Sequence, residues 1–114
     1  MKTNYFLKKI YSKKTPYFIA EIGINHNGSV ELAKKIIKIA KENNFDAVKF
    51  QKRDLQTCIP INERQKTRQT IWGEMTYMEY KKKIEFDDVQ FDKIHKFCKK
   101  INIDMLCSAF DIES

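Results

Sequence analysis

Four polar residues occur in segments that otherwise have the composition of buried strands. They are an acid, an amine, an amide and a hydroxyl: Glu21, Lys49, Gln51 and Ser108. Strands buried in a parallel sheet are normally almost continuously apolar, so polar side chains within them need a reason. These residue types can exchange protons, bind anions and hold polar groups of a substrate. They are therefore our candidates for a catalytic or ligand-binding site.

Each of these residues also has a purely structural explanation. Glu21 and Lys49 could form an ion pair between neighbouring strands that serves only the fold. Gln51 could be a satisfied interior amide, and Ser108 could be a small filler that bonds to the backbone. The residue types alone do not decide between the two explanations.

The chain alternates strand, helix, strand, long connection, helix and strand. This is the order of βαβ units, in which helices cover a parallel sheet. Side chains alternate between the two faces of a strand, and here one face of each expected strand is wholly apolar. The other face turns polar toward the carboxyl end of the strand. The expected strands are residues 17–23, 46–51 and 103–110.

The position of the polar residues along the strands favours a functional site. Open α/β sheets and closed (β/α)₈ barrels both bind ligands at the carboxyl ends of their strands. Glu21, Lys49, Gln51 and Ser108 all lie toward those ends. We expect them to face one common mouth.

Two helices should connect and support these strands. The first begins after the N-cap Ser29 and places its apolar residues on one face with a period near 3.6. Asn43 and Asn44 end it, because asparagine tolerates the left-handed backbone conformation that helix ends need. The second is expected at residues 88–100, with Asn102 as a similar stop.

Residues 52–86 are too many for an ordinary connection, whose median is about 4–6 residues. Long connections of this kind are usually lids or binding loops. The aromatic residues Trp72, Tyr77 and Tyr80 indicate that this insertion folds against something. The run of lysines at 81–83 is expected to be a solvated face.

Single histidines and cysteines give weaker signals. His26 follows the first strand in a polar turn, and we expect it to orient that loop through a hydrogen bond. It has no partners at the spacing of metal ligands, so we expect no metal ligand in this chain. His95 should be exposed beside the apolar stripe of its helix. Cys107 should be inert core, because a nucleophilic cysteine needs a base and partial exposure.

The composition fits one soluble domain of 114 residues, of which 42% are hydrophobic. No apolar run approaches the roughly 18 residues that cross a bilayer, and the N-terminus lacks a signal-peptide core. The three cysteines contain no C-x-x-C pair, which favours a reducing cytoplasm. They are Cys58, Cys98 and Cys107.

A net charge of +7 leaves a competing function open. A small basic α/β module could bind RNA or another polyanion, with Trp72, Tyr77 and Tyr80 as stacking surfaces among basic residues. The lysines are scattered over the whole chain, however, and this function explains the charge without explaining the polar strand residues.

Three segments together resemble the sialic acid synthase (N-acetylneuraminate synthase) family. They are EIGINHNGS at 21–29, DAVKFQK at 46–52 and LCSAFD at 106–111. The resemblance implies the N-terminal portion of a (β/α)₈ TIM barrel, about three parallel strands with covering helices, over residues 1–114. Residues 1–16 would be an N-terminal extension, and residues 52–86 a long βα insertion.

The resemblance also implies a reaction in carbohydrate biosynthesis. Members of this family are transferases that condense phosphoenolpyruvate with N-acetylmannosamine, or a related amino sugar, into a nine-carbon 2-keto sugar acid. A divalent metal, manganese or magnesium, assists, and its ligands lie on later strands. The complete family enzyme is expected to be a cytoplasmic homodimer with small-molecule substrates, and we expect neither a membrane nor a nucleic-acid partner.

The family roles can be carried onto matching positions of this sequence. The resemblance assigns Lys49 and Ser108 to phosphoenolpyruvate and Gln51 to the sugar hydroxyls. Glu21 would orient the sugar or relay a proton near its aldehyde. Two loop residues would shape the mouth of the site: Asn25 and His26.

The sequence departs from the family pattern in two ways. The third segment reads C-S-A-F where the family often has S-T-P-F, so contacts near Ser108 could be shifted. A barrel needs about 250 residues, and three strands leave open edges, so we expect the isolated chain to be inactive as a fragment. A legionaminic or pseudaminic acid synthase is an alternative that these segments do not exclude.

Overall fold

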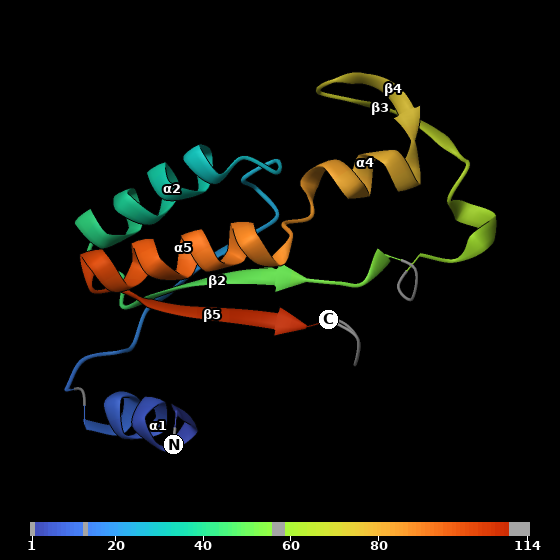
Figure 1. The fold of residues 1–114 in the computed structure, drawn as a ribbon. Coiled ribbons are helices and arrows are strands. Elements are labelled where there is room, and N and C mark those ends of the chain that lie inside the picture. The colour runs from blue at the N-terminus through green and yellow to red at the C-terminus, as the bar shows by residue number, and fades with distance from the viewer. Residues whose placement is uncertain (1, 13, 56–58, 110–114) are drawn as a thin grey trace.

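The computed structural model describes residues 2–12, 14–55 and 59–109, with side chains from Leu7 onward. Its centre is a parallel sheet with the strand order β1-β2-β5. Two helices, α2 and α5, lie side by side on one face of this sheet (Figure 1). The α/β architecture expected from the sequence is confirmed. The bounds are β1 Ile19–Gly23, α2 Val30–Glu42, β2 Ala47–Lys52, α5 Asp88–Ile101 and β5 Asp104–Ala109.

Helix α2 begins and ends at the residues that the sequence predicts. The side chain of Ser29 accepts a hydrogen bond from the backbone N–H of Leu32 at 3.1 Å, which satisfies a donor that the helix itself cannot. Asn43 caps the carboxyl end, and Asn44 follows with a φ of +65°. The asparagine pair therefore turns the chain directly into β2.

Helix α5 is held at both ends in a similar way. Asp87 and Gln90 form a capping box in which each side chain accepts from the backbone of the other. Asn102 takes the left-handed conformation at the C-cap, as predicted. The helix begins at Asp88, as expected, and its C-cap leads directly into β5.

The hydrophobic core lies between the sheet and these two helices. It is built around Phe50 and Val48 of β2, Ile37 of α2 and Ile94 of α5, all fully buried. These positions are the apolar strand faces and helix stripes that the sequence pattern predicts. The opposite face of the sheet therefore carries the polar residues.

The insertion at 52–86 contains secondary structure of its own. A single-turn 3₁₀ helix, η1 (Ile61–Glu63), leads to a hairpin of β3 (Thr67–Thr70) and β4 (Gly73–Thr76) and then to helix α4 (Tyr77–Ile84). A capping box of Thr76 and Glu79 starts α4. In Figure 1 the hairpin and α4 lie beyond the carboxyl end of β2.

The N-terminal segment forms a helix, α1 (Lys2–Ser12), which the sequence did not lead us to expect. In Figure 1 it lies on the other side of the sheet from α2 and α5. Lys9 forms an ion pair of 2.8 Å with Asp104, the first residue of β5, and Tyr17 donates a hydrogen bond to the same carboxylate. These bonds join the segment to the amino-terminal end of the sheet, away from the expected mouth.

Small differences separate the predicted and observed strands. The first strand begins at Ile19 instead of residue 17, and the second runs one residue further, to Lys52. Phe110 and Asp111 of the third family segment, and Cys58, lie outside the described residues. Within the described part of the chain, no helix combines the length and the hydrophobicity that crossing a membrane requires.

Candidate active site

The first pair of candidate residues lies in register on neighbouring strands. Glu21 of β1 and Lys49 of β2 are direct partners in the parallel ladder. The Lys49 Nζ is 3.6 Å from the Glu21 Oε2. The side chains keep 34% and 56% of their surface exposed, so this ion pair contributes little to stability, about 0–1 kcal/mol. The fold alone therefore gives a weak reason for placing these two charges in the sheet.

The second pair lies two residues further along β2 and joins this strand to β5. Gln51 of β2 is the register partner of Ser108 of β5. On its other side Gln51 lies beside Gly23 of β1. A Cβ atom added to Gly23 would be 3.4 Å from the Nε2 atom of Gln51. Both side chains are half-buried.

All four candidates lie on the sheet face that the helices leave open. Ala20, Val48, Phe50 and Met105 pack against α2 and α5, and side chains alternate along each strand. The candidates occupy the intervening positions on the opposite face. The structure thus brings an acid, an amine, an amide and a hydroxyl together near the carboxyl ends of three adjoining strands. Their roles there stay predictions.

The loop after β1 is built around His26, which is only 1% exposed. The backbone N–H of Gly28 donates to His26 Nδ1 at 3.0 Å, so the expected loop-orienting hydrogen bond is present. Burial lowers the pKa of His26 from 6.5 to about 4, although a hydrogen bond to the backbone of Gly23 acts in the opposite direction. The imidazole is therefore neutral near pH 7. Asn25 of the same loop is exposed, and its N–H donates to the Ile22 carbonyl in the turn.

Ring contacts join this loop to the end of the insertion. The His26 ring stacks on Phe86, with centroids 3.8 Å and planes 14° apart, and lies 5.9 Å from the Phe50 ring. Gly28 makes a second contact, because a Cβ atom there would lie only 1.9 Å from the Lys83 carbonyl oxygen. The loop and the carboxyl end of α4 are therefore packed directly on each other.

Glu85 and Asp88 hold the insertion against the end of β2. The Arg53 N–H donates to Glu85 Oε1 at 2.9 Å, and Lys52 forms an ion pair of 2.9 Å with Asp88. Burial raises the pKa of Glu85, while the bond from the Arg53 backbone opposes this shift. The two ends of the 52–86 insertion thus meet at one point.

The aromatic residues of the insertion pack on basic side chains of the same segment. The Arg68 guanidinium lies 5.3 Å and 5.2 Å from the ring centroids of Tyr77 and Tyr80. The Lys81 ammonium approaches the same two rings, at 5.3 Å and 5.5 Å, and Lys83 lies 4.9 Å from Trp72. These rings are already covered by cations of the chain, which weakens the RNA-stacking alternative.

The expectation that all three lysines at 81–83 are solvated is wrong for Lys81. Lys82 and Lys83 are exposed, but Lys81 is only 7% exposed. The reason is helical spacing: Met78, Lys81 and Ile84 recur every three residues and are the buried residues of α4. Burial lowers the pKa of Lys81, and the charges of Arg53 and Arg68 lower it further.

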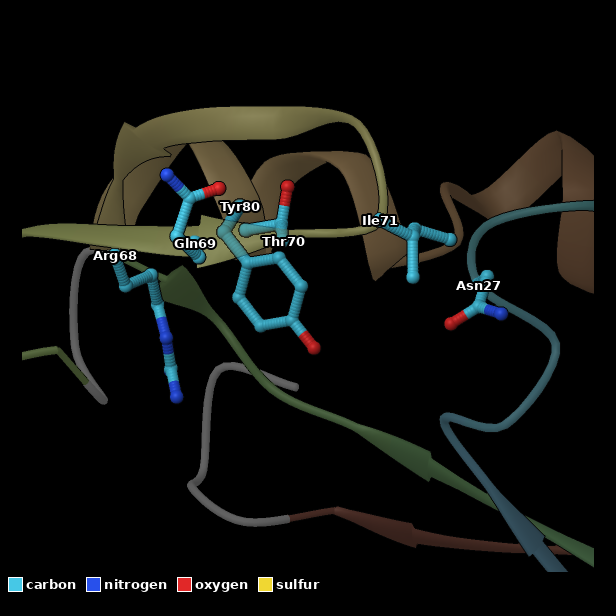
Figure 2. A pocket seen from close by; sticks show the side chains of 6 residues that line it. All are labelled: Asn27, Arg68, Gln69, Thr70, Ile71 and Tyr80. Carbon is cyan, nitrogen blue, oxygen red and sulfur yellow. The ribbon is translucent and has the colours of Figure 1, made fainter.

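A pocket of about 370 Å³ opens between the hairpin, α4 and the loop after β1. Figure 2 shows the side chains of Arg68 and Tyr80 extending from β3 and α4 into the space below the hairpin, with Asn27 across from them. No local sequence pattern indicates this pocket, because its walls come from segments about forty residues apart. Its lining residues are Asn27, Arg68, Gln69, Thr70, Ile71 and Tyr80.

The remaining single-residue expectations have mixed outcomes. His95 is exposed, as expected, and Cys98 is buried in the core, where burial raises the pKa of its thiol to about 11. The expectation of a buried Cys107 is wrong, because this residue is exposed. Strand alternation places it on the helix side of β5, as expected, but it keeps an exposed surface there.

The described residues do not form a metal site. Nowhere in ranges 2–12, 14–55 and 59–109 do three or more His, Cys, Asp or Glu side chains gather closely enough to hold a metal ion. The divalent metal that the family resemblance implies, with ligands expected on later strands, therefore finds no complete ligand set among these residues.

Comparisons with known proteins agree with this architecture. The model of the NeuB family matches residues 36–114. An N-acetylneuraminate-9-phosphate synthase of Drosophila melanogaster is 42% identical over 100 residues, which are 86% of this chain and 27% of that protein. An N,N'-diacetyllegionaminic acid synthase of Campylobacter jejuni is 38% identical over 104 residues, which are 90% of this chain and 31% of that protein.

A solved structure extends the likeness to three dimensions. The crystal structure of an N-acetylneuraminic acid (sialic acid) synthetase of Leptospira borgpetersenii, in complex with citrate, superposes with a TM-score of 0.65 at 26% identity. The match covers 85% of this chain and 30% of that one, so the chain spans about a third or less of the proteins it matches. The three parallel strands and their helices are the N-terminal portion of a (β/α)₈ barrel.

Proposed function

Because the chain belongs to the NeuB family, we propose that it supplies one rim of an active site that condenses phosphoenolpyruvate with an N-acetylated amino sugar. The product is a nine-carbon 2-keto sugar acid of the sialic acid type. One observation carries the proposal: Glu21 and Lys49 are register partners 3.6 Å apart, on the open face of the sheet near its carboxyl edge. The ammonium of Lys49 in that position fits an anionic substrate better than it fits a sheet interior.

Lys49 binds the anionic donor in this proposal. Its ammonium is a compact point charge, suited to a carboxylate or a phosphate, and it is about one-third exposed on the open face. The register partner of Lys49 on β5 is Leu106, and Ser108 lies two residues further along that strand. In this proposal the Ser108 hydroxyl adds a hydrogen bond to the same ligand. Lys49 and Ser108 thus hold the donor between β2 and β5.

Glu21 and Gln51 act on the sugar acceptor. The enol carbon of phosphoenolpyruvate forms a bond to the aldehyde carbon of the open-chain sugar, and the aldehyde oxygen takes up a proton. Glu21 is placed to orient the sugar or to relay that proton. The Gln51 amide can donate to one hydroxyl and accept from another. Water then adds to the carbon that carries the enol oxygen, and phosphate leaves.

The loop residues act through shape in this proposal. A neutral, buried His26 fixes the turn after β1 and leaves Asn25 exposed at its surface. No group of three or more metal-binding side chains gathers among the described residues, and the roles proposed here are those of the side chains alone. A cytoplasmic location and a homodimer are further proposals for the complete protein. The free thiols of Cys98 and Cys107 support the former.

The test of this function is phosphate release by the protein that carries this chain. Phosphate should be released from phosphoenolpyruvate only when an N-acetylated amino sugar is present, with one sugar acid formed for each phosphate. N-acetylmannosamine and the amino sugars of legionaminic and pseudaminic acid synthesis are the acceptors to compare. Release that does not depend on any amino sugar would contradict the proposal.

A further inference from the structure

Gly23, the last residue of β1, is buried, although the exposed Glu21 lies two residues before it on the same strand. The side chain of Gln51 lies against it. A Cβ atom added to Gly23 would be 3.4 Å from Nε2 and 3.6 Å from Cδ of that amide, which is van der Waals contact. The amide of Gln51 therefore lies where any other residue at position 23 would place its side chain.

An irregularity in β1 sets which part of this strand lies beneath the amide. Glu21 pairs with Lys49 in the parallel ladder. Two residues later, Gly23 pairs with Phe50 and not with Gln51. The strand thus carries one extra residue here, as in a β-bulge, and bulges next to active sites commonly re-aim side chains.

The turn after β1 fixes Gly23 in a conformation that few residue types adopt. The N–H of Asn25 donates to the carbonyl oxygen of Ile22 at 3.0 Å, so Gly23 is the first central residue of a β-turn. Its φ is +56°, and turns with a positive φ at this position are dominated by glycine, asparagine and aspartate. His26, which stacks on Phe86, also has a hydrogen bond to the backbone of Gly23. The position of Gly23 is therefore set by the loop as well as by the ladder.

A long amide side chain binds a substrate better when it is already ordered. Fixing a glutamine side chain costs up to about 2 kcal/mol of rotamer freedom, and packing that fixes it in advance removes this cost from binding. We propose that Gly23 is a positioning residue for Gln51: it leaves the space in which the amide is held ready for a hydroxyl of the amino-sugar acceptor. This inference rests on the proposed condensation and on the role of Gln51 in it.

Two variants of Gly23 separate this role from backbone strain. Asparagine suits the backbone, since three asparagines of the described chain have φ values between +52° and +65°, but its side chain would fill the space of the Gln51 amide. Alanine suits this backbone less well, whereas its methyl group would only touch the amide. Strain alone predicts the larger effect for Gly23→Ala, and displacement of Gln51 predicts the larger effect for Gly23→Asn.

Steady-state kinetics of the protein that carries this chain measure the effect. The acceptor is N-acetylmannosamine, or the amino sugar that proves the better acceptor in the assay of function. Gly23→Asn should raise the KM for the acceptor roughly three- to tenfold, as the loss of one hydrogen bond does, with kcat within about twofold of the wild type. Gly23→Ala should raise this KM less. The affinity for phosphoenolpyruvate, measured by calorimetry, should stay within about twofold in both variants.

A control and a double variant assign the effect to Gln51. Gly73→Asn makes the same change at another glycine with a positive φ, where an added Cβ has no atom within 4 Å, and it should change none of these values. Gln51→Ala should itself raise the KM for the acceptor. Gly23→Asn added to Gln51→Ala should raise it no further, because the side chain that it displaces is already absent. In the wild-type protein, a nuclear Overhauser effect should join the Gly23 α hydrogens to the Gln51 amide hydrogens, a measurement that needs no stable variant.

Each of the other results contradicts the inference. An effect of Gly23→Ala as large as that of Gly23→Asn would identify backbone strain as the cause. An equal rise of the KM with and without Gln51, or no nuclear Overhauser effect between the two residues, would mean that Gly23 does not act through this amide. If neither Gly23→Asn nor Gln51→Ala changes the KM, the inference and the sugar-binding role of Gln51 fail together. The proposed condensation survives all of these results, and only a wild-type protein without phosphate release that depends on an amino sugar would contradict it as well.

Discussion

The ring of His26 stacks on the ring of Phe86 at a centroid distance of 3.8 Å. The first residue belongs to the turn after β1, and the second follows α4 at the end of the insertion. Aromatic contacts of this kind contribute about 0.5–1.5 kcal/mol beyond the area they bury. This pair therefore couples the loop at the mouth of the sheet to the segment that carries the pocket beneath the hairpin.

The buried His26 predicts a pH-dependent stability. In the unfolded chain its pKa is 6.5, and in the folded chain it is about 4. Between these values the unfolded chain takes up a proton that the folded chain does not, so the free energy of unfolding falls as the pH decreases from 6.5 to 4. The difference corresponds to about 3 kcal/mol. Urea unfolding measured at several pH values checks this.

A pair of histidine variants isolates this effect. In His26→Gln the fall in the free energy of unfolding between pH 6.5 and 4 should disappear, whatever the stability of that variant at pH 7. In His95→Gln, which removes an exposed histidine from α5, the slope should stay as in the wild type. A slope that survives in His26→Gln would mean that other groups cause it.

The contact of Gly28 with α4 predicts a large loss of stability in Gly28→Ala. The methyl group would lie 1.9 Å from the Lys83 carbonyl oxygen, and the residue has a φ of +77°. Gly73→Ala is the matched control, because Gly73 also has a positive φ but has no atom within 4 Å of its added Cβ. Gly28→Ala should cost at least about 2 kcal/mol more than the control in urea unfolding. Equal losses would show that α4 moves aside easily.

The parts of the fold that follow from local sequence were predictable. Strand alternation placed Glu21 and Lys49 on the open face. The caps at Ser29 and Asn102 mark the start of α2 and the end of α5 where expected. These features depend on residues close together in the chain. The T-x-x-E pattern of Thr76 and Glu79 is also such a local signal, and it marks the start of α4.

The remainder of the site depends on tertiary packing, which local patterns do not contain. Lys81 is buried because α4 turns that face toward the protein, although three successive lysines suggest a solvated face. The pocket beneath the hairpin exists only because the turn at Asn27 and the strand at Arg68 meet across about forty residues. His26 looked like an isolated loop residue, since its partner Phe86 is sixty residues away.

The exposed ion pair of Glu21 and Lys49 predicts that Glu21 serves function more than stability. Glu21→Gln removes the charge and keeps the shape, and it should change the free energy of unfolding by less than about 1 kcal/mol. In the protein that carries this chain it should lower the rate of condensation roughly a hundredfold or more, because a group that transfers protons is lost. Glu31→Gln, at an exposed helix position, is the control and should leave the rate unchanged. A loss of several kcal/mol in stability would favour a structural ion pair instead.

Lys49 and Lys52 allow a test of which face of β2 binds the donor. They lie on the same strand, but Lys49 faces the open side, whereas Lys52 pairs with Asp88 at the start of α5. Lys49→Ala should weaken phosphoenolpyruvate binding roughly ten- to a hundredfold in a calorimetric titration, since it removes a charge-assisted hydrogen bond. Lys52→Ala removes the same charge and should leave that affinity within about twofold of the wild type, because single surface charges act weakly at a distance. An unchanged affinity in Lys49→Ala would remove this lysine from the site, and equal losses in both variants would mean that the donor responds only to net charge.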